Sequence, residues 1–500
     1  MTFYEKYKPF RNYMRRFDLV PSLVDLWRYA QHIDDGHPLP LNYAVGGDPL
    51  CGRNLKDQFY PWDLAILARE LILNTTGHGD RTLGMYSHLA NAMNHIRKLD
   101  EAAFTDAGPQ SIDMLYELNR IAHRQFPWQI KDGVAPMMRA FKVFGASAVE
   151  EVVVRELNMT TRQFLLLGIA IYGHFLKQPG LSTNQDYGVL GISREASNDF
   201  FRRITSTIED LRAETIKLQL YNQDWLYTWN PLEATPLVSF DPKFPERVLC
   251  PIPRYLARRA SAGIFYDLVK SKGFDQSYGD SFQSYIGEVI EATCPSTTFA
   301  ALGEEEYYVG NNLKHGADWV LSDSTGHIFV ECKTKRLTLS AKTQSNTEAM
   351  ERDLEVMAQA VVQNYRNIDD AVKGKTRWKA DGRPIYPLVL TLEDWFVFSP
   401  RVREMLNKHV LQVLTEKGMR EEMLDEMPFT IASAHEFEIT SQVIAQRSIF
   451  SVMSKKVTPD KRGFSLLPFA SGDFPDEMRR IKWCLFAEDW ERLVLGIPYE

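Results

Sequence analysis

The sequence has few of the features that mark a secreted or zinc-binding protein. Among its 500 residues are only five cysteines, Cys51, Cys250, Cys294, Cys332 and Cys484. No two of them form a CxxC pair or another spacing that is typical of zinc sites. Reduced thiols are therefore expected, as in a cytoplasmic protein.

Long apolar runs are also missing. The first residues, MTFYEKYKPFRNYMRRF, contain no continuous apolar segment of the kind found in signal peptides. The most apolar run, FLLLGIAIYGHFL at 164–176, is too short to span a bilayer and predicts a buried helix. We therefore expect a cytoplasmic protein without a membrane partner.

An excess of basic residues is lacking too. The chain has 58 Lys and Arg against 65 Asp and Glu, which gives a net charge of −7. This excludes the overall basic character of a histone-like protein. Any surface for nucleic acid must therefore be a local basic patch.

The first half of the chain has the apolar spacing of helices. Apolar residues recur every three or four positions in segments such as 62–74, 111–126 and 161–178, and almost no segment alternates with period two. This predicts an all-helical region over residues 1–245, with room for two subdomains.

The composition changes at 233–259, where five prolines fall within 20 residues, as in an extended connector. Beyond it, strand-like and helix-like segments alternate, which predicts an α/β domain over residues 246–500 with a central mixed sheet. The expected strands are 305–310, 317–322, 327–335, 386–392 and 429–439, and the expected helices are 280–294, 345–370 and 400–417.

Within the second half, GADWVLSDSTGHIFVECKTKR at 316–336 reads as a β-hairpin with charged residues on a core strand. Asp323 can start the turn, and Gly326 can close it in the left-handed conformation. A turn centred between positions 324 and 325 places Asp318 directly across from Glu331. A shift of two residues would place Asp318 opposite Lys333 instead, on the same face.

Side chains alternate along a strand, so Glu331 and Lys333 share one face with Phe329 and Lys335. Two nearby carboxylates repel each other unless a cation lies between them, and oxygen ligands without a His or Cys pair favour Mg²⁺. The alternative is a cross-strand salt bridge on a solvated face. The acid-x-Lys string alone is weak evidence for such a site, because it also occurs at 241–243, where no strand is expected.

In this setting the residues resemble the PD-(D/E)XK nuclease superfamily, which has the restriction-endonuclease-like fold. Asp318 matches the first acid of its pattern, Glu331 the second acid and Lys333 the lysine, while Ala317 stands where the family name has proline. The family often adds a glutamate on the preceding helix. Glu288 is the preferred candidate for it, and Glu291 is the alternative.

The resemblance implies a role for each matching residue. Asp318, Glu331 and the backbone carbonyl of Cys332 would hold Mg²⁺, for which Mn²⁺ can substitute. Lys333 would orient the attacking water or help to deprotonate it, and it would offset charge at the phosphorus. Glu288 would hold a water or a second ion.

Basic residues outside this motif are candidates for contacts with the nucleic-acid backbone. Two lie just past it in sequence, with a solvated strand end as the alternative, and four lie in a basic segment that we expect to be mobile. Ordinary surface charge is the alternative for these four. The six residues are Lys335, Arg336, Lys455, Lys456, Lys461 and Arg462.

The leading hypothesis is therefore a Mg²⁺-dependent endonuclease that cuts DNA, with a helical region that recognises a substrate, a partner or a trigger. By analogy of architecture alone, this suits restriction or another anti-phage defence, with a phage-derived or protein trigger. Dimerisation is compatible with it, because cutting both strands of a duplex often takes two active sites. The alternatives are an RNA nuclease that cuts tRNA in abortive infection, and a non-catalytic protein that uses the fold to bind nucleic acid.

Overall fold

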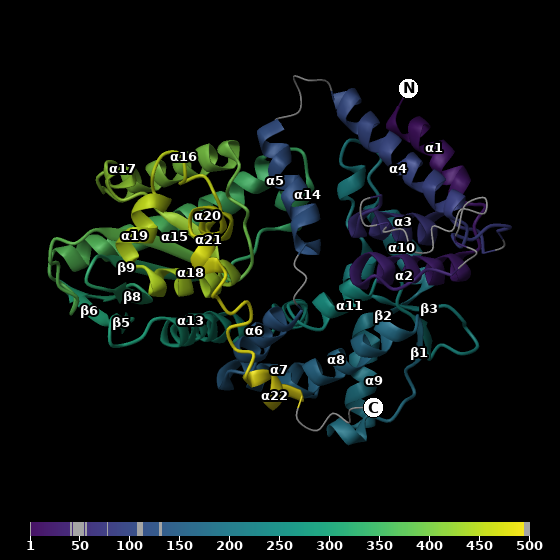
Figure 1. Ribbon diagram of the computed structural model, residues 1–500, viewed down its shortest axis with the longest axis horizontal. Helices are drawn as coiled ribbons and strands as arrows, with labels where there is room; N and C mark the ends of the chain where they lie inside the picture. The colour runs from purple at the N-terminus through teal and green to yellow at the C-terminus, as the bar shows by residue number, and fades with distance from the viewer. Residues whose placement is uncertain are drawn as a thin grey trace. The chain divides into compact units, whose positions relative to one another are not determined.

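The computed structural model describes residues 2–40, 43, 55, 58–77, 79–107, 114–129 and 133–494 (Figure 1). Cys51 lies outside these residues, and the four cysteines within them are free thiols. None of the helices in these ranges is long and apolar enough to cross a membrane. The segment 164–176 lies in a helix with a largely buried surface, as predicted.

The chain forms two compact units that exchange segments. The first comprises Met1–Ile112, Arg124–Phe274 and Glu488–Glu500, and the second comprises Asp113–His123 and Asp275–Ala487. The predicted boundary at 245/246 falls inside the first unit. The chain continues there past the proline-rich connector because Ile252 and Tyr255 pack into the core of the first unit.

The first unit is predominantly helical. Apolar stripes on its first four helices meet in one buried cluster, which explains their amphipathic spacing. Its helices are α1 (Phe3–Met14), α2 (Leu19–Asp35), α3 (Pro61–Asn74), α4 (Tyr86–Ala107), α6 (Val134–Phe144), α7 (Ser147–Leu157), α8 (Thr161–Lys177), α9 (Arg194–Ile204), α10 (Ile208–Leu218), α11 (Pro253–Arg259), α12 (Ile264–Leu268) and α22 (Asp489–Val494).

The prediction that residues 1–245 are all-helical is wrong. A four-stranded sheet lies in the first unit, in the order β1-β4-β3-β2. Its strands are β1 (Gly180–Ser182), β2 (Thr205–Thr207), β3 (Leu237–Ser239) and β4 (Arg247–Leu249). Each has three residues, which is too short to show period-two alternation, and they pair across long stretches of chain.

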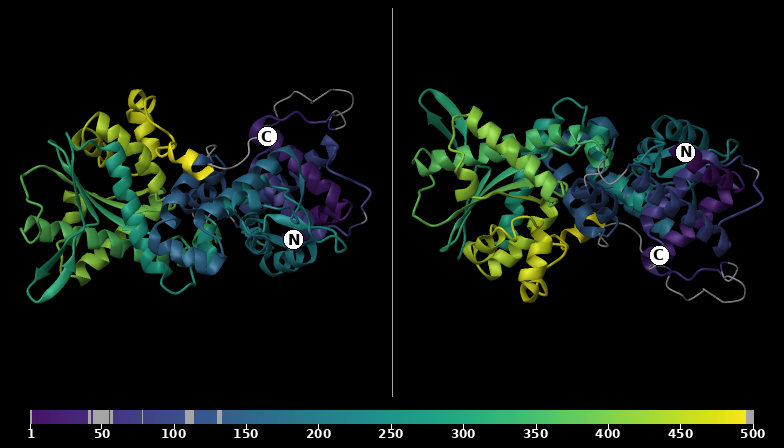
Figure 2. Two further views of the ribbon diagram at one scale, coloured as in Figure 1. Left: turned by 90° about the horizontal axis from the view of Figure 1, so that it is seen from below. Right: turned by 90° about the horizontal axis from the view of Figure 1, so that it is seen from above.

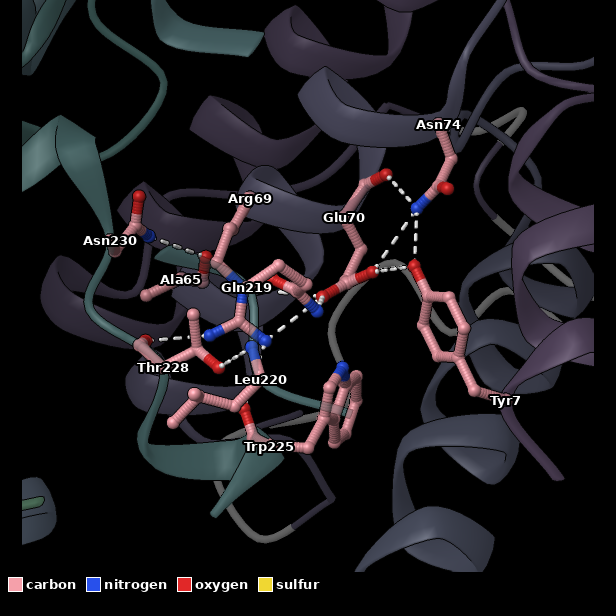
Figure 3. A network of polar contacts seen from close by, with 10 residues as sticks. All are labelled: Tyr7, Ala65, Arg69, Glu70, Asn74, Gln219, Leu220, Trp225, Thr228 and Asn230. Carbon is pink, nitrogen blue, oxygen red and sulfur yellow. Dashed lines mark hydrogen bonds and ion pairs between the residues drawn. The ribbon is translucent and has the colours of Figure 1, made fainter. Parts of the chain in front are cut away.

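A buried polar network joins distant segments of the first unit (Figure 3). Arg69 and Glu70 of α3 form an ion pair of 2.9 Å with both side chains shielded from solvent. Tyr7 of α1 donates its hydroxyl to Glu70 at 2.6 Å, and Arg69 donates to the carbonyl of Thr228 at 2.7 Å. The Arg69 guanidinium also lies over the ring of Trp225, 5.5 Å from its centroid. These contacts hold α1, α3 and the 225–228 turn together, so the network has a structural role.

The second unit is built on a mixed five-stranded sheet in the order β11-β10-β9-β8-β5. Figure 2 shows this sheet with helices on either side of it. Its strands are β5 (Ala300–Gly303), β8 (Trp319–Ser322), β9 (His327–Lys333), β10 (Ile385–Thr391) and β11 (Thr430–Ser433). Strands β9, β10 and β11 run parallel, whereas β8 is antiparallel to both β5 and β9. A separate hairpin is formed by β6 (Glu306–Val309) and β7 (Asn312–His315).

Helices lie on both faces of this sheet, which makes the unit an α/β layer structure. Val320, Phe329 and Val389 share a core with the apolar sides of α15 and α16 on one face. On the other face, the ring of Trp319 lies so close to Gly287 of α13 that an added Cβ would be 2.3 Å from it. The helices of this unit are α5 (Met114–Gln125), α13 (Phe274–Thr293), α14 (Leu339–Thr343), α15 (Glu348–Val372), α16 (Pro400–Glu416), α17 (Met423–Glu426), α18 (Ala434–Gln446), α19 (Ile449–Lys456), α20 (Leu466–Asp473) and α21 (Pro475–Met478).

One predicted strand is largely a helix. The segment 429–439 is extended only as far as Ser433, and α18 begins at the next residue. Ser433 accepts a hydrogen bond from the N–H of Glu436, and the Glu436 carboxylate accepts one from the N–H of Ser433. This capping box starts the helix and overrides the β-like composition of the segment.

Candidate active site

The β8–β9 hairpin has the register that the sequence predicts. Trp319 pairs with Val330 and Ser322 pairs with His327, so the turn is centred between positions 324 and 325. Asp318 directly precedes Trp319, and Glu331 directly follows Val330. The two acids therefore lie at the same end of neighbouring strands.

The turn is closed differently from the prediction. Asp323 caps it, because its Oδ1 accepts hydrogen bonds from the N–H groups of Thr325 and Gly326 at 2.7 and 3.0 Å. Gly326, however, does not adopt a left-handed conformation. A Cβ at this position would lie 3.1 Å from a side-chain carbon of Ile449 and 3.3 Å from the carbonyl of Pro384. Close packing is therefore what favours glycine here.

The three residues of the acid-acid-lysine motif are held by hydrogen bonds. Asp318 accepts one from the backbone N–H of Cys332 at 2.5 Å, and Lys333 donates to Glu331 Oε1 at 2.7 Å. The other carboxylate oxygen of Glu331, Oε2, is buried and has no hydrogen-bond partner. Glu331 is only 1% exposed, so this is not a salt bridge on a solvated face.

Burial dominates the electrostatics of the site. It raises the pKa of Glu331 to about 8, and the neighbouring Asp318 raises it as well, whereas Lys333 lowers it. Burial likewise raises the pKa of Asp318 to about 6. Burial lowers the pKa of Lys333, but the two carboxylates outweigh this effect and raise it overall. The buried Glu331 and the half-buried Asp318 thus favour uptake of a proton, and a divalent cation in its place would stabilise both ionised carboxylates.

Only some of the predicted residues lie where they could bind such a cation. Among the described residues, no three His, Cys, Asp or Glu side chains gather as a metal-binding cluster. Glu288 therefore does not complete such a cluster with Asp318 and Glu331. Glu288 and Glu291 are both exposed on α13, so the choice between them and the role of Glu288 stay predictions. The two acids still fit a hard cation, because Glu331 Oε2 is buried and unpartnered.

Sequence reasoning missed Glu304, a third carboxylate near this site. Gly303 of β5 pairs with Trp319, so Glu304 follows β5 at the level of Asp318 on the next strand. Its charge raises the pKa of both Asp318 and Glu331. Glu304 contacts His315 Nδ1 and the amide nitrogen of Gln283, each at 3.0 Å. The acidic run at 304–306 was the available signal, but β5 has only four residues and was not predicted.

Helix α15 contributes one polar group to the site. Gln363 accepts a hydrogen bond from Lys333 Nζ at 3.3 Å through its side-chain oxygen. Gln359, one turn earlier, is exposed. The Lys333 ammonium is thus held between Glu331 on its own strand and Gln363 on the covering helix.

Two of the six basic candidates are buried, which argues against contact with nucleic acid in this conformation. Arg336 is 8% exposed and forms an ion pair with Glu393 at 2.8 Å. Lys456 is 2% exposed and donates to the carbonyl of Arg462 at 3.2 Å. Lys456 ends α19 and its side chain packs inward, which the sequence did not predict.

The other four basic candidates are more accessible. Lys335, Lys455 and Arg462 are exposed, and Lys461 is half-buried. Lys335 pairs with Asp353 at 3.3 Å, and Lys461 pairs with Asp473 at 3.0 Å. Their contact with nucleic acid stays a prediction.

The structure also brings together a serine, a histidine and an aspartate. Ser322 Oγ lies 2.7 Å from His327 Nδ1, and His327 Nε2 lies 3.1 Å from Asp381 Oδ1. His327 is only 1% exposed and packs against the ring of Trp378, with 4.9 Å between the ring centroids. The imidazole is shielded from any substrate, so we assign this group a structural role at the start of β9.

Comparison of the chain with protein-family models, with curated proteins and with solved structures gave no match. The functional argument therefore depends on the geometry of the site itself.

Proposed function

We propose that the protein is a Mg²⁺-dependent endonuclease of the PD-(D/E)XK type that hydrolyses phosphodiester bonds, with DNA as its substrate. The observation that carries this proposal is the buried Glu331 carboxylate, which has one unpartnered oxygen beside Asp318 and Lys333. The mixed sheet, in which an antiparallel pair leads into parallel strands, also supports the resemblance to restriction-endonuclease-like proteins. A role in anti-phage defence belongs to the same proposal.

In this proposal each residue has a defined task. Asp318, Glu331 and the Cys332 carbonyl would hold the Mg²⁺ ion, which supplies positive charge for the phosphate oxygens. Lys333, fixed by Glu331 and Gln363, would orient the water that attacks the phosphorus. The backbone N–H of Cys332 keeps the Asp318 carboxylate in place. Burial of the site limits competing water and strengthens these electrostatic interactions.

The first test measures cation binding without any requirement for turnover. The full chain is titrated with Mn²⁺, and the bound ion is followed by electron paramagnetic resonance. We expect one saturable site that is lost in Glu331→Gln and in Asp318→Asn. The variant Glu355→Gln, which changes an exposed acid on α15, should bind Mn²⁺ like the unchanged protein. Equal Mn²⁺ binding in all four proteins would contradict the proposal.

The second test measures cleavage. The full chain is incubated with supercoiled plasmid and with total tRNA, in Mg²⁺ and in EDTA. We expect plasmid cleavage only in Mg²⁺, and a loss of at least about 100-fold in Lys333→Met, because the lysine acts on the attacking water. Cleavage that persists in EDTA would overturn the metal-dependent mechanism, and cleavage of tRNA alone would replace DNA by RNA as the substrate.

A further inference from the structure

A second charged site in the second unit contains none of the residues of the acid-acid-lysine motif. A cleft of about 640 Å³ that is open to solvent is lined by residues of α16 and of the 459–463 turn. This volume lies in the range of ligand pockets for small organic molecules. Three of its lining residues are the cations Arg403, Lys408 and Arg462. We call this cavity the α16 cleft.

The α16 cleft adjoins a smaller cavity, and Arg403 and Asn407 line both. The smaller cavity lies where β10 and β11 end, and Lys456 is among its lining residues. Arg403 and Lys456 both donate to the carbonyl oxygen of Arg462. The two cations and the 459–463 turn are therefore held together as one structure.

Three of these cations have no carboxylate within ion-pair distance among the described residues. In the part of the chain that the structure describes, neither Arg403 nor Lys456 nor Arg462 forms an ion pair with a carboxylate. The one acid that lines the α16 cleft, Glu404, pairs with Arg401 at 3.1 Å. The α16 cleft is therefore lined by three cations and by one acid that pairs with a residue outside the cleft lining.

The pKa values of Arg403 and Lys456 are both lowered in the folded protein. Burial lowers the pKa of Arg403 to about 10, and the charge of Arg462 lowers it as well. Burial lowers the pKa of Lys456 to about 7, and Arg403 lowers it further, whereas Glu436 raises it. An anion in the cleft would stabilise the protonated forms of both.

Two acids, Glu436 and Asp394, line the smaller cavity. Glu436 accepts hydrogen bonds from the N–H groups of Ser433 and Leu467, at 3.0 Å each, so its carboxylate is occupied by the backbone. Burial raises the pKa of Glu436 to about 7, and the nearby Asp394 raises it as well. Neither acid lines the α16 cleft itself.

The walls of the α16 cleft also offer apolar surface, which suits an anion that carries an organic group. Phe398, Leu411 and Pro459 supply apolar surface. The cleft also borders the first turns of α16, a helix of 17 residues whose N-terminal end favours negative charge.

We infer that the α16 cleft binds a phosphate group carried by a nucleotide, with Arg403, Lys408 and Arg462 contacting the phosphate and Lys456 supporting them from the adjoining cavity. The nucleotide can be free or can be the phosphorylated end of a nucleic-acid strand. None of its residues belongs to the acid-acid-lysine motif, so the inference does not rest on the proposed metal centre, although Lys456 and Arg462 are also candidates for contacts with nucleic acid.

The test is isothermal titration calorimetry of the full chain at low salt in EDTA. The probes are AMP, adenosine, inorganic phosphate and a 5′-phosphorylated tetranucleotide. We expect AMP to bind at one saturable site and adenosine to bind far more weakly. Arg403→Gln should weaken AMP binding by at least about tenfold, because it removes a charge-assisted hydrogen bond.

Matched variants separate recognition from folding. Lys408→Gln changes an exposed residue of the cleft and should weaken AMP binding about two- to fivefold without altering thermal unfolding. Lys417→Gln changes an exposed cation at the other end of α16 and should leave AMP binding unchanged. Lys333→Met should also bind AMP normally, which distinguishes this site from the proposed nuclease centre.

The relative affinities of the probes identify the ligand. Tighter binding of AMP than of the tetranucleotide would identify a free nucleotide as the ligand, and the reverse would identify a strand end. The inference is overturned if none of the phosphate-bearing probes binds, if adenosine binds as well as AMP, or if Lys408→Gln and Arg403→Gln bind AMP like the unchanged protein.

Discussion

At the scale of single residues, Glu331 has the least favourable charge environment of the candidate site. Its carboxylate is buried beside Asp318, and Lys333 is the only cation that donates a hydrogen bond to it among the described contacts. A protein selected for stability alone would gain little from such an arrangement, because burying charge costs more than a pair of this kind returns. The environment is consistent with a functional role.

The first prediction concerns the balance of charge at this site. In EDTA at pH 7.5, Lys333→Met should lower the free energy of unfolding by about 3 kcal/mol, because it leaves the buried Glu331 carboxylate and the half-buried Asp318 carboxylate without a cation. Glu331→Gln should change this free energy by less than about 1 kcal/mol, because Lys333 still has the negative charge of Asp318 near it. Urea unfolding monitored by circular dichroism measures both. A larger loss in Glu331→Gln than in Lys333→Met would contradict this account.

The second prediction concerns Lys456, whose pKa falls to about 7 in the folded protein because of burial. The unfolded chain binds this proton up to its ordinary pKa, so from about pH 7 to 10 the unfolded state holds more protons than the folded state. Stability from this group therefore rises with pH over that range. Lys456→Met should stabilise the protein by about 1 kcal/mol or more at pH 6, because it removes a buried charge, and the gain should shrink towards pH 10.

Thermal unfolding of both proteins between pH 6 and 10 measures this difference. Lys455→Met is the control, because Lys455 is the exposed neighbour on the same helix. A gain for Lys456→Met that is constant with pH would show that the amine is not the titrating group.

At the scale of elements, helix α15 connects the covering layer to the sheet. Asn364 is fully buried and donates to the carbonyl of Phe329 on β9 at 2.9 Å and to that of Leu388 on β10 at 3.2 Å. Gln363, its neighbour on the helix, contacts Lys333. The same helix thus fixes the strand that carries Glu331 and also contacts the lysine directly.

The third prediction compares two asparagines on α15. Asn364→Ala should destabilise the protein by about 1–3 kcal/mol, because two sheet carbonyls lose their donor. Asn367 lies three residues later and is equally buried, but neither polar atom of its side chain has a hydrogen-bond partner. Asn367→Leu should therefore be neutral or stabilising. Chemical unfolding measures both, and equal destabilisation by the two substitutions would refute the assignment.

At the scale of the whole molecule, the chain passes between its two compact units more than once. The segment Asp113–His123 belongs to the second unit although it is flanked on both sides by segments of the first. Arg120 of α5 donates to the carbonyl of Thr343 on α14 at 2.6 Å and pairs with Glu117 at 2.6 Å. The second unit is therefore not a contiguous stretch of sequence.

The fourth prediction tests this exchange of segments. Arg120→Met should destabilise the second unit by about 3 kcal/mol, because Arg120 is buried and the substitution removes its ion pair with Glu117 and its hydrogen bond to the Thr343 carbonyl. Hydrogen exchange at Leu339–Thr343 should accelerate at least about tenfold. Arg202→Met, which changes an exposed arginine of the first unit, should leave this exchange unaltered. Unchanged protection in Arg120→Met would show that α5 does not stabilise α14.

The sequence alone was sufficient for features that depend on neighbours along the chain. The hairpin register follows from turn chemistry, and the shared face of Glu331 and Lys333 follows from strand alternation. Most long helices and several strands were predicted from apolar spacing, because one element buries one face.

Only the tertiary structure decided which distant residues meet. Glu304 joins the site because β5 pairs with β8, and Gln363 joins it because α15 packs over β9. Packing also decided that Arg336 and Lys456 are buried and that α5 belongs to the second unit. Such contacts depend on shape and burial across the whole fold, and local patterns in a sequence carry little record of them.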